Sequence, residues 1–125
     1  MKIKLSLLFC YAILCAIISG CHNPNDTLRT IKNRGEIVVI TDNSAHGFYL
    51  YQDQPMGFEY ELAREFADFL NVKLLVITPG WEKMFRTLLD SNGDLIASSL
   101  TKTERRKTRV IFSDEYMPVQ QQVII

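Results

Sequence analysis

The feature that most constrains the fold is the alternation of short β-branched apolar runs with helical patterns. Apolar runs at Ile37–Ile40, Val72–Ile77 and Leu95–Ala97 have the length and composition of buried strands. The segments Phe58–Leu70 and Trp81–Leu89 lie between them and show helical spacing of apolar residues. Strand, helix and strand joined by short connections predict right-handed βαβ units. We therefore expect an α/β fold with a mostly parallel sheet.

The clearest helix is predicted over Phe58–Leu70, and Asn71 is its expected stop. Four large residues recur at i, i+4, i+8 and i+11 and form one apolar stripe: Phe58, Leu62, Phe66 and Phe69. The apolar side of the second helix carries Trp81, Phe85, Leu88 and Leu89. A shorter helix is expected to start at Asp26 or Thr27 and to end at Gly35.

Three further segments complete the expected order of elements. Thr41–Met56 has no period and contains Asn, Asp, Gly and Pro, so it is predicted to be loop. Thr103–Arg109 is polar and basic and favours a single helical turn. Val119–Ile125 is a fourth strand candidate.

The N-terminus has the pattern of an exported protein. Residues 1–20 begin with Lys2 and Lys4, continue with the uncharged run Leu5–Ile18 and end in small residues, which is typical of a signal peptide. Ile18-Ser19-Gly20-Cys21 resembles a bacterial lipobox, in which the cysteine becomes the lipidated first residue. The alternative is a plain signal peptide with a cysteine there by chance. We expect the lipobox, with residues 21–27 as a tether.

A lipobox predicts a protein anchored by lipid at the periplasmic face of a membrane. His22 follows the cysteine where an Asp often retains Gram-negative lipoproteins at the inner membrane, so the outer membrane is favoured. Cleavage also removes Cys10 and Cys15, and the remaining Cys21 permits no disulfide. The 14 basic and 14 acidic residues give no basic excess, so nucleic-acid binding is not expected.

Polar residues follow the predicted strands where ligands of parallel sheets bind. Ser98, Ser99 and Thr101 place hydroxyls after the third strand, and Arg105 and Arg106 come next. Hydroxyls with a guanidinium form a good carboxylate site. Spacing alone favours the alternative of a polar turn followed by a solvated basic run.

The first loop holds a cluster of aromatic side chains. Phe48, Tyr49 and Tyr51 either stack on a ligand or plug the sheet edge, and the sequence does not decide between the two.

Signals for an enzyme are weak in this chain. Neither Ser98 nor Ser99 lies in a nucleophile elbow, and no glycine-rich phosphate motif occurs. His46 alone, with His22 in the tether, gives no two-histidine metal site. Glu59 and Asp94 are interpreted as polar groups at a helix start and a strand start. We expect no catalytic residues, no metal and no cofactor.

The order of several motifs resembles family 3 of the bacterial extracellular solute-binding proteins. The strongest match is 94–106 (DLIASSLTKTERR), followed by 112–116 (FSDEY). Weaker matches are 28–35 (LRTIKNRG), 55–62 (PMGFEYEL) and Trp81. Residues 57–63 (GFEYELA) resemble most closely the branch that forms the sensor-like domain of membrane-bound lytic murein transglycosylases.

This resemblance implies a type II periplasmic-binding-protein-like fold that closes on a ligand in the cleft between two lobes. Residues 28–118 would form the first lobe, 119–125 would begin the interlobe crossing strand, and the second lobe is missing. The resemblance implies that Arg106 clamps a ligand carboxylate, with Ser99 and Thr101 adding bonds and Ser98 nearby. Phe48 or Tyr49 would supply an aromatic wall.

The resemblance implies a binding module for an amino acid or a similar small carboxylate, acting as a transport receptor or a sensor. An ABC transporter permease or peptidoglycan is the partner that it suggests. The alternative is the non-catalytic regulatory part of a lytic transglycosylase. Because the sequence stops where the family crosses to its second lobe, we expect a longer parent protein.

Overall fold

The computed structural model describes residues 24–118, and for 24–26 only the backbone. The predicted signal peptide, Cys21 and the Val119–Ile125 strand lie outside these residues. The first helix, α2, covers Pro24–Arg34, and Gly35 follows it as predicted. The helix begins before the predicted Asp26 or Thr27, so residues 24–27 are helical and not part of a tether. The remaining elements are β1 (Glu36–Ile40), β2 (Tyr49–Tyr51), β3 (Gln54–Met56), α3 (Phe58–Leu70), β4 (Lys73–Ile77), η1 (Trp81–Lys83), α4 (Met84–Leu89), β5 (Leu95–Ile96) and α5 (Glu104–Lys107).

The expected parallel sheet is confirmed. Its strand order is β4-β1-β5, with both neighbours parallel to the central strand β1. Ile37 pairs with Leu74, and Val39 pairs with Val76 on one side and Leu95 on the other. The carboxyl ends of the three strands therefore meet at one edge of the sheet.

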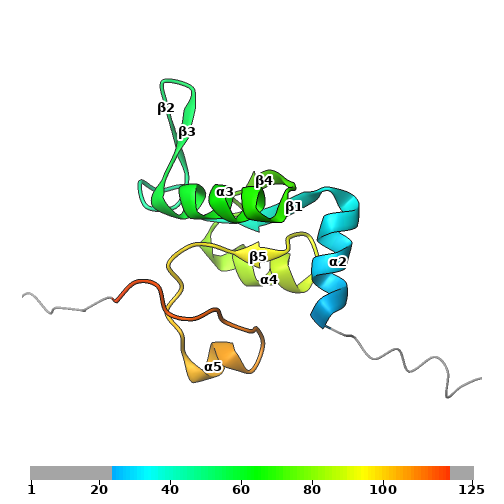
Figure 1. Ribbon diagram of the computed structural model, residues 1–125. Coiled ribbons are helices and arrows are strands. Elements are labelled where there is room, and N and C mark those ends of the chain that lie inside the picture. The colour runs from blue at the N-terminus through cyan, green and yellow to red at the C-terminus, as the bar shows by residue number, and fades with distance from the viewer. Residues whose placement is uncertain (1–23, 119–125) are drawn as a thin grey trace, which may run out of the picture.

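Helices cover both faces of the sheet (Figure 1). Ile37 and Val39 of β1 belong to the core that α3 closes, together with Ile31 of α2. Ile40 points to the opposite face, where α4 packs and Met84 is fully buried. Helix α2 stands at the amino end of β1, so the opposite edge is left to the loops that follow the strands.

Helix α3 spans the predicted residues, but the face that it packs on the sheet was not predicted. The residues of the apolar stripe are each more than two-fifths exposed, and Phe69 is 81% exposed. The buried positions of the helix are Glu59, Ala63, Ala67 and Leu70. The two alanines have short side chains, so the helix axis lies close to the sheet and the bulky stripe points away from it.

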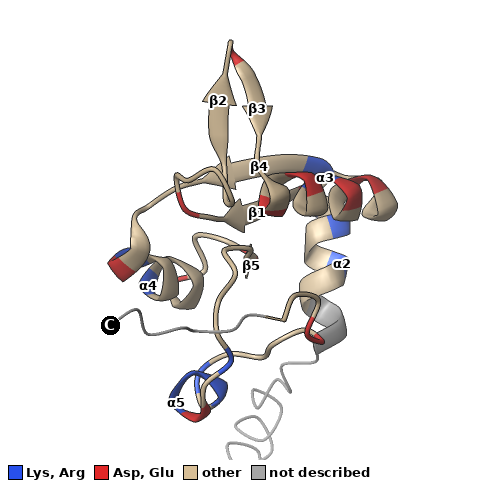
Figure 2. Ribbon diagram, turned by 90° about the vertical axis from the view of Figure 1, so that its left-hand side faces the viewer, with Lys and Arg blue, Asp and Glu red and all other residues tan. Residues whose placement is uncertain are grey.

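The prediction that Thr41–Met56 is entirely loop is wrong. It contains the antiparallel hairpin of β2 and β3, which projects from the body of the protein (Figures 1 and 2). Gln52 and Asp53 form its turn with φ of 49° and 60°. Two consecutive positive φ values are the geometry that matches the twist of a two-residue hairpin. Sequence reasoning missed the hairpin because the usual Asn-Gly signal is absent.

The second predicted helix is divided into a 3₁₀ turn, η1, and the short helix α4. Met84 is its buried residue, whereas Trp81 and Leu89 of the predicted apolar side are about half exposed. The exposed Trp81 ring is thereby free to line a site. Within residues 24–118, no helix has the length and apolar content needed to cross a membrane.

Candidate functional site

Two predicted segments meet at the carboxyl edge of the sheet. Asp42 follows β1, and Ser98 follows β5. The Ala97 N–H donates to the Ile40 carbonyl at 2.9 Å, which extends the pairing of the two strands to this edge. The Ser98 hydroxyl then donates to the Asp42 carboxylate. The expectation that these segments share one edge is confirmed.

Asp42 is a half-buried carboxylate that donors hold in its ionised form. Partial burial by itself would raise the pKa of this carboxyl, but hydrogen bonds from Ser44 and Ser98 outweigh it. Its own backbone N–H and the nearby His46 act in the same direction, so the pKa of Asp42 is lowered. The edge therefore carries a negative charge that is stabilised mainly by hydrogen bonds from serine hydroxyls.

Arg106 lies at the same edge, on α5. Its Nη1 donates to the Thr101 carbonyl oxygen at 2.9 Å. Its guanidinium carbon lies 5.9 Å from the centre of the Trp81 ring and 5.4 Å from that of Phe85, within the range of cation–π attraction. Within residues 24–118, no carboxylate is close enough to form a salt bridge with Arg106. Its other N–H groups can serve a ligand carboxylate.

Arg105, the sequence neighbour of Arg106, lies in a different environment. It is exposed, whereas Arg106 is half-buried, although both lie in the basic group on α5 (Figure 2). The structure thus separates the two neighbours and places only Arg106 between aromatic rings.

Glu59 is the residue at this edge that sequence reasoning missed. It is fully buried in the first turn of α3, and its Oε1 accepts hydrogen bonds from the Ser99 N–H and hydroxyl, each at 2.6 Å. The Tyr116 hydroxyl donates to the same carboxylate at 2.9–3.0 Å. The sequence did hold a signal for its burial. Glu59 lies four residues before Ala63 and eight before Ala67, so it shares the helix face that those two alanines pack on the sheet.

The two residues predicted as an aromatic wall have different positions. The Phe48 N–H donates to the Asp42 carbonyl at 3.0 Å, and its ring meets Tyr60 edge-on at 5.4 Å. Tyr49 opens β2 and pairs with Met56 in the projecting hairpin. Figure 1 shows that hairpin on the far side of the sheet from α5, so Tyr49 is not brought to Arg106.

The loop after β1 is tied to the start of α3 by backbone contacts. The Glu59 and Tyr60 N–H groups donate to the carbonyls of His46 and Gly47 at 3.0 and 3.2 Å. Gly57 has φ of 137°, and a Cβ there would lie 2.1 Å from the Gly47 oxygen. Only glycine permits this approach, which places Glu59 beside the site.

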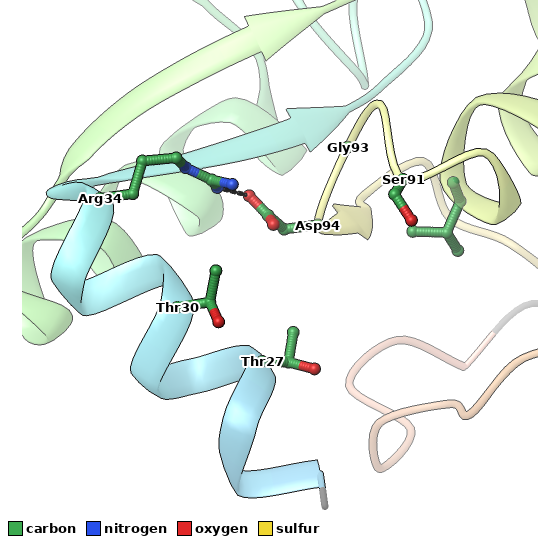
Figure 3. A pocket seen from close by; sticks show the side chains of 7 residues that line it. Thr27, Thr30, Arg34, Ser91, Gly93 and Asp94 are labelled. Carbon is green, nitrogen blue, oxygen red and sulfur yellow. Dashed lines mark hydrogen bonds and ion pairs between the residues drawn. The ribbon is translucent and has the colours of Figure 1, made fainter. Parts of the chain in front are cut away.

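A separate hollow of about 350 Å³ lies at the amino edge of the sheet (Figure 3). There Arg34 of α2 forms an ion pair with Asp94 at the start of β5, and the Val38 N–H donates to the same carboxylate at 2.7 Å. The prediction of Asp94 as a strand-start polar group is confirmed. Across residues 24–118, no three His, Cys, Asp or Glu side chains are grouped to hold a metal.

Comparisons with known proteins agree with this fold. Residues 37–125 match the family described as bacterial extracellular solute-binding proteins, family 3. The chain is 46% identical over 99 residues to membrane-bound lytic murein transglycosylase F of Desulfosudis oleivorans, covering 79% of the chain and 22% of that protein. The relative of the same name from Erwinia tasmaniensis is 36% identical over 100 residues, covering 79% and 20%. The chain thus spans about a fifth of these relatives' length.

Two solved structures give the same fold. The ancestral cationic amino acid solute-binding protein aligns with TM-score 0.68 and 34% identity, covering 73% of this chain and 41% of that one. The arginine-bound form of domain 1 from TmArgBP aligns with TM-score 0.65 and 32% identity, covering 70% of this chain and 71% of that one. TmArgBP is from T. maritima.

Proposed function

This chain belongs to family 3 of the bacterial extracellular solute-binding proteins, and we propose that its site binds a free amino acid or a closely related small carboxylate. Its described part has the fold of one lobe of a type II periplasmic binding protein. The residues present carry no catalytic domain of a transglycosylase. Binding without covalent chemistry is therefore the function to assign.

The observation that carries the proposal is that two opposite charges stand at one edge without forming an ion pair with each other. Arg106 offers guanidinium N–H groups, and Asp42 offers a carboxylate, with the Ser98–Thr101 loop between them. An amino acid carries a carboxylate and an ammonium group, so it matches both. Arginine's planar fork suits a carboxylate in particular. The exposed Trp81 ring, beside Arg106, supplies apolar surface for the rest of the ligand.

One lobe is sufficient for binding in our proposal. Small-ligand sites usually bury most of the ligand, and a single lobe covers one side of it. The solved domain 1 of TmArgBP is nevertheless an arginine-bound form, and its length is close to that of this chain. We therefore expect binding that is measurable but weaker than that of a two-lobed receptor.

A thermal-shift screen of the purified chain against the twenty L-amino acids tests the proposal. At least one amino acid should raise the melting temperature in proportion to the logarithm of its concentration. L-Arginine is the first to examine, because the solved relatives bind it. Glycerol at matched concentration serves as the control for non-specific stabilisation. A flat response to all twenty would contradict the proposal.

The transglycosylase relatives favour a second candidate for the wider protein. We propose that a longer parent would use this lobe as a sensor beside a peptidoglycan-cleaving domain. Sequencing the gene past codon 125 tests this. A second lobe and then a stop would indicate a transport receptor that works with an ABC transporter permease. A further domain with a catalytic glutamate would indicate the sensor.

Anchoring is a separate proposal that rests on the lipobox-like residues before Cys21. The curated relatives are membrane-bound, which supports membrane association. We propose lipidation of Cys21 and attachment at the periplasmic face, in the outer membrane of a Gram-negative host. Radiolabelled palmitate should be incorporated by the unsubstituted protein and not by the Cys21→Ala variant. Equal labelling of both would overturn it.

A further inference from the structure

The buried carboxylate of Glu59 has no use in the binding scheme above, and it needs an explanation. The residue is 0% exposed, and burying a carboxylate is costly unless donors compensate it. In the described part of the chain, no Lys, Arg or His nitrogen lies within salt-bridge distance of it. If this position served stability alone, an apolar side chain would fill it without the free-energy cost of burying a carboxylate.

The partners of Glu59 come from two distant segments. Ser99 is 40 residues away and donates twice, through its backbone N–H and its hydroxyl. Tyr116 is 57 residues away and donates through its phenol. All three groups donate to the carboxylate oxygens. Burial of the phenol, followed by its hydrogen bond to Glu59, raises the pKa of Tyr116 to about 12.

The conformation of Ser99 shows what these bonds achieve. Its φ is 47°, in the left-handed region that residues other than glycine rarely adopt. The two bonds to Glu59 hold the backbone and the side chain of Ser99 in this conformation. On one side, Ser98 is turned toward Asp42, and on the other, the Thr101 carbonyl is turned toward Arg106. The Ser98–Thr101 loop, which lies between Asp42 and Arg106, is therefore held at Ser99.

We propose that Glu59 is the positioning residue of the binding site, which holds the Ser98–Thr101 loop in its ligand-ready conformation through Ser99. This inference rests on the proposed function. Both donors of Ser99 are used by Glu59, so Ser99 acts on the ligand through the loop geometry. Thr101 and Arg106 still have donors that can serve a ligand carboxylate.

The test compares Glu59→Gln with two matched variants of the same helix. Glu61→Gln makes the same chemical change at a half-buried residue that pairs with Arg64. Ala67→Gly lowers helix stability at a buried position remote from the loop. Binding of L-arginine is measured by calorimetry, and exchange of the Ser99 amide hydrogen is measured by NMR.

We expect Glu59→Gln to weaken L-arginine binding by about tenfold, because an amide has one acceptor oxygen instead of two and accepts hydrogen bonds more weakly than a carboxylate. It should also speed exchange of the Ser99 amide by about tenfold or more. Glu61→Gln and Ala67→Gly should leave the affinity within about twofold. An affinity that follows the melting temperature across all three variants would reduce Glu59 to a structural role and overturn the proposal.

Two measurements keep the proposal testable if Glu59→Gln does not fold. In the parent chain, the Ser99 amide should exchange far more slowly than that of exposed Lys102, and equal rates would overturn the positioning role. Tyr116→Phe removes one donor from the carboxylate and should speed Ser99 exchange by about twofold to fivefold. If the parent fails to bind L-arginine, the proposed ligand is wrong, and the Ser99 exchange rates still decide the role of Glu59.

Discussion

The two edges of the sheet differ in which groups neutralise or hold their partly or fully buried carboxylates. At the amino edge, the carboxylate of Asp94 is paired with the guanidinium of Arg34 and also accepts the Val38 N–H. At the carboxyl edge, Asp42 and Glu59 are held by serine and tyrosine hydroxyls, and Arg106 stands apart between aromatic rings. One edge is neutralised within the protein, whereas the other keeps its charges separate.

This difference is our reason for proposing a binding site at the carboxyl edge and a structural contact at the amino edge. An internal ion pair such as Arg34–Asp94 leaves no charge for a ligand to match, although a hollow lies beside it (Figure 3). Separated charges cost stability and are useful where a ligand later compensates them. We therefore propose ligand binding at the carboxyl edge and not at the hollow beside Arg34 and Asp94.

The largest effect is expected from Arg106→Ala at the carboxyl edge. Removing the only guanidinium proposed to meet the ligand carboxylate should weaken L-arginine binding by about 100-fold, or about 3 kcal/mol. The matched change Arg105→Ala, at its exposed neighbour, should alter the affinity by less than about twofold. Calorimetry measures both. Equal effects of the two variants would mean that the clamp is misassigned.

Asp94→Ala should have the reverse profile at the amino edge. The substitution leaves the Val38 N–H without its acceptor and removes the ion pair of Arg34, so the free energy of unfolding should fall by about 1–3 kcal/mol. Binding of L-arginine by the folded fraction should be unchanged. Urea unfolding and calorimetry separate the two quantities. A loss of affinity without a loss of stability would remove the distinction between the edges.

The third prediction concerns acid and uses Asp42→Asn. Because the pKa of Asp42 is lowered in the folded state, its ionised form stabilises the protein above the ordinary aspartate pKa of about 4. That contribution is lost as the pH falls through the lower folded pKa. The stability gap between parent and variant should thus be constant near neutral pH and narrow below about pH 4. Urea unfolding at several pH values measures it, with hairpin-tip Asp53→Asn as control. A stability difference that grows in acid would contradict the lowered pKa of Asp42.

The smallest effect is expected at the exposed stripe of α3. Phe69 is 81% exposed, so Phe69→Ser should change the free energy of unfolding by less than about 0.5 kcal/mol. Its neighbour Leu70 is buried, and Leu70→Ala should cost several times more. Thermal unfolding of the chain compares them. A large loss of unfolding free energy in Phe69→Ser would indicate that the Phe58–Phe69 stripe is the face of α3 that packs on the sheet.

The strand and helix order could be predicted from the sequence, because buried runs such as Ile37–Ile40 have few alternative structures. The packed face of α3 could not, since Ala63 and Ala67 carry a weaker hydrophobic signal than four large residues on the other side. The β2–β3 hairpin was missed because Gln52 and Asp53 adopt positive φ without the residues that usually signal it.

The site shows the same division. Ser98 and Arg106 were singled out because hydroxyl and guanidinium groups follow a strand in sequence. Spacing alone favoured a solvated polar turn there, and the ligand-clamping role of Arg106 came from the family resemblance. The link from Glu59 to Ser99 and Tyr116 joins residues 40 and 57 positions apart, so it depends on the tertiary fold. The placement of Phe48 beside Tyr60, and of Tyr49 in a projecting hairpin, depends on it too.

The most direct test is an NMR titration of the isotope-labelled chain with L-arginine, mapped residue by residue. The account predicts that the shifts concentrate at the carboxyl edge, on Asp42, Thr101 and Arg106, and leave Arg34 and Asp94 unchanged. Shifts centred on the Arg34–Asp94 hollow, or no saturable shifts at all, would contradict the assignment of ligand binding to this edge.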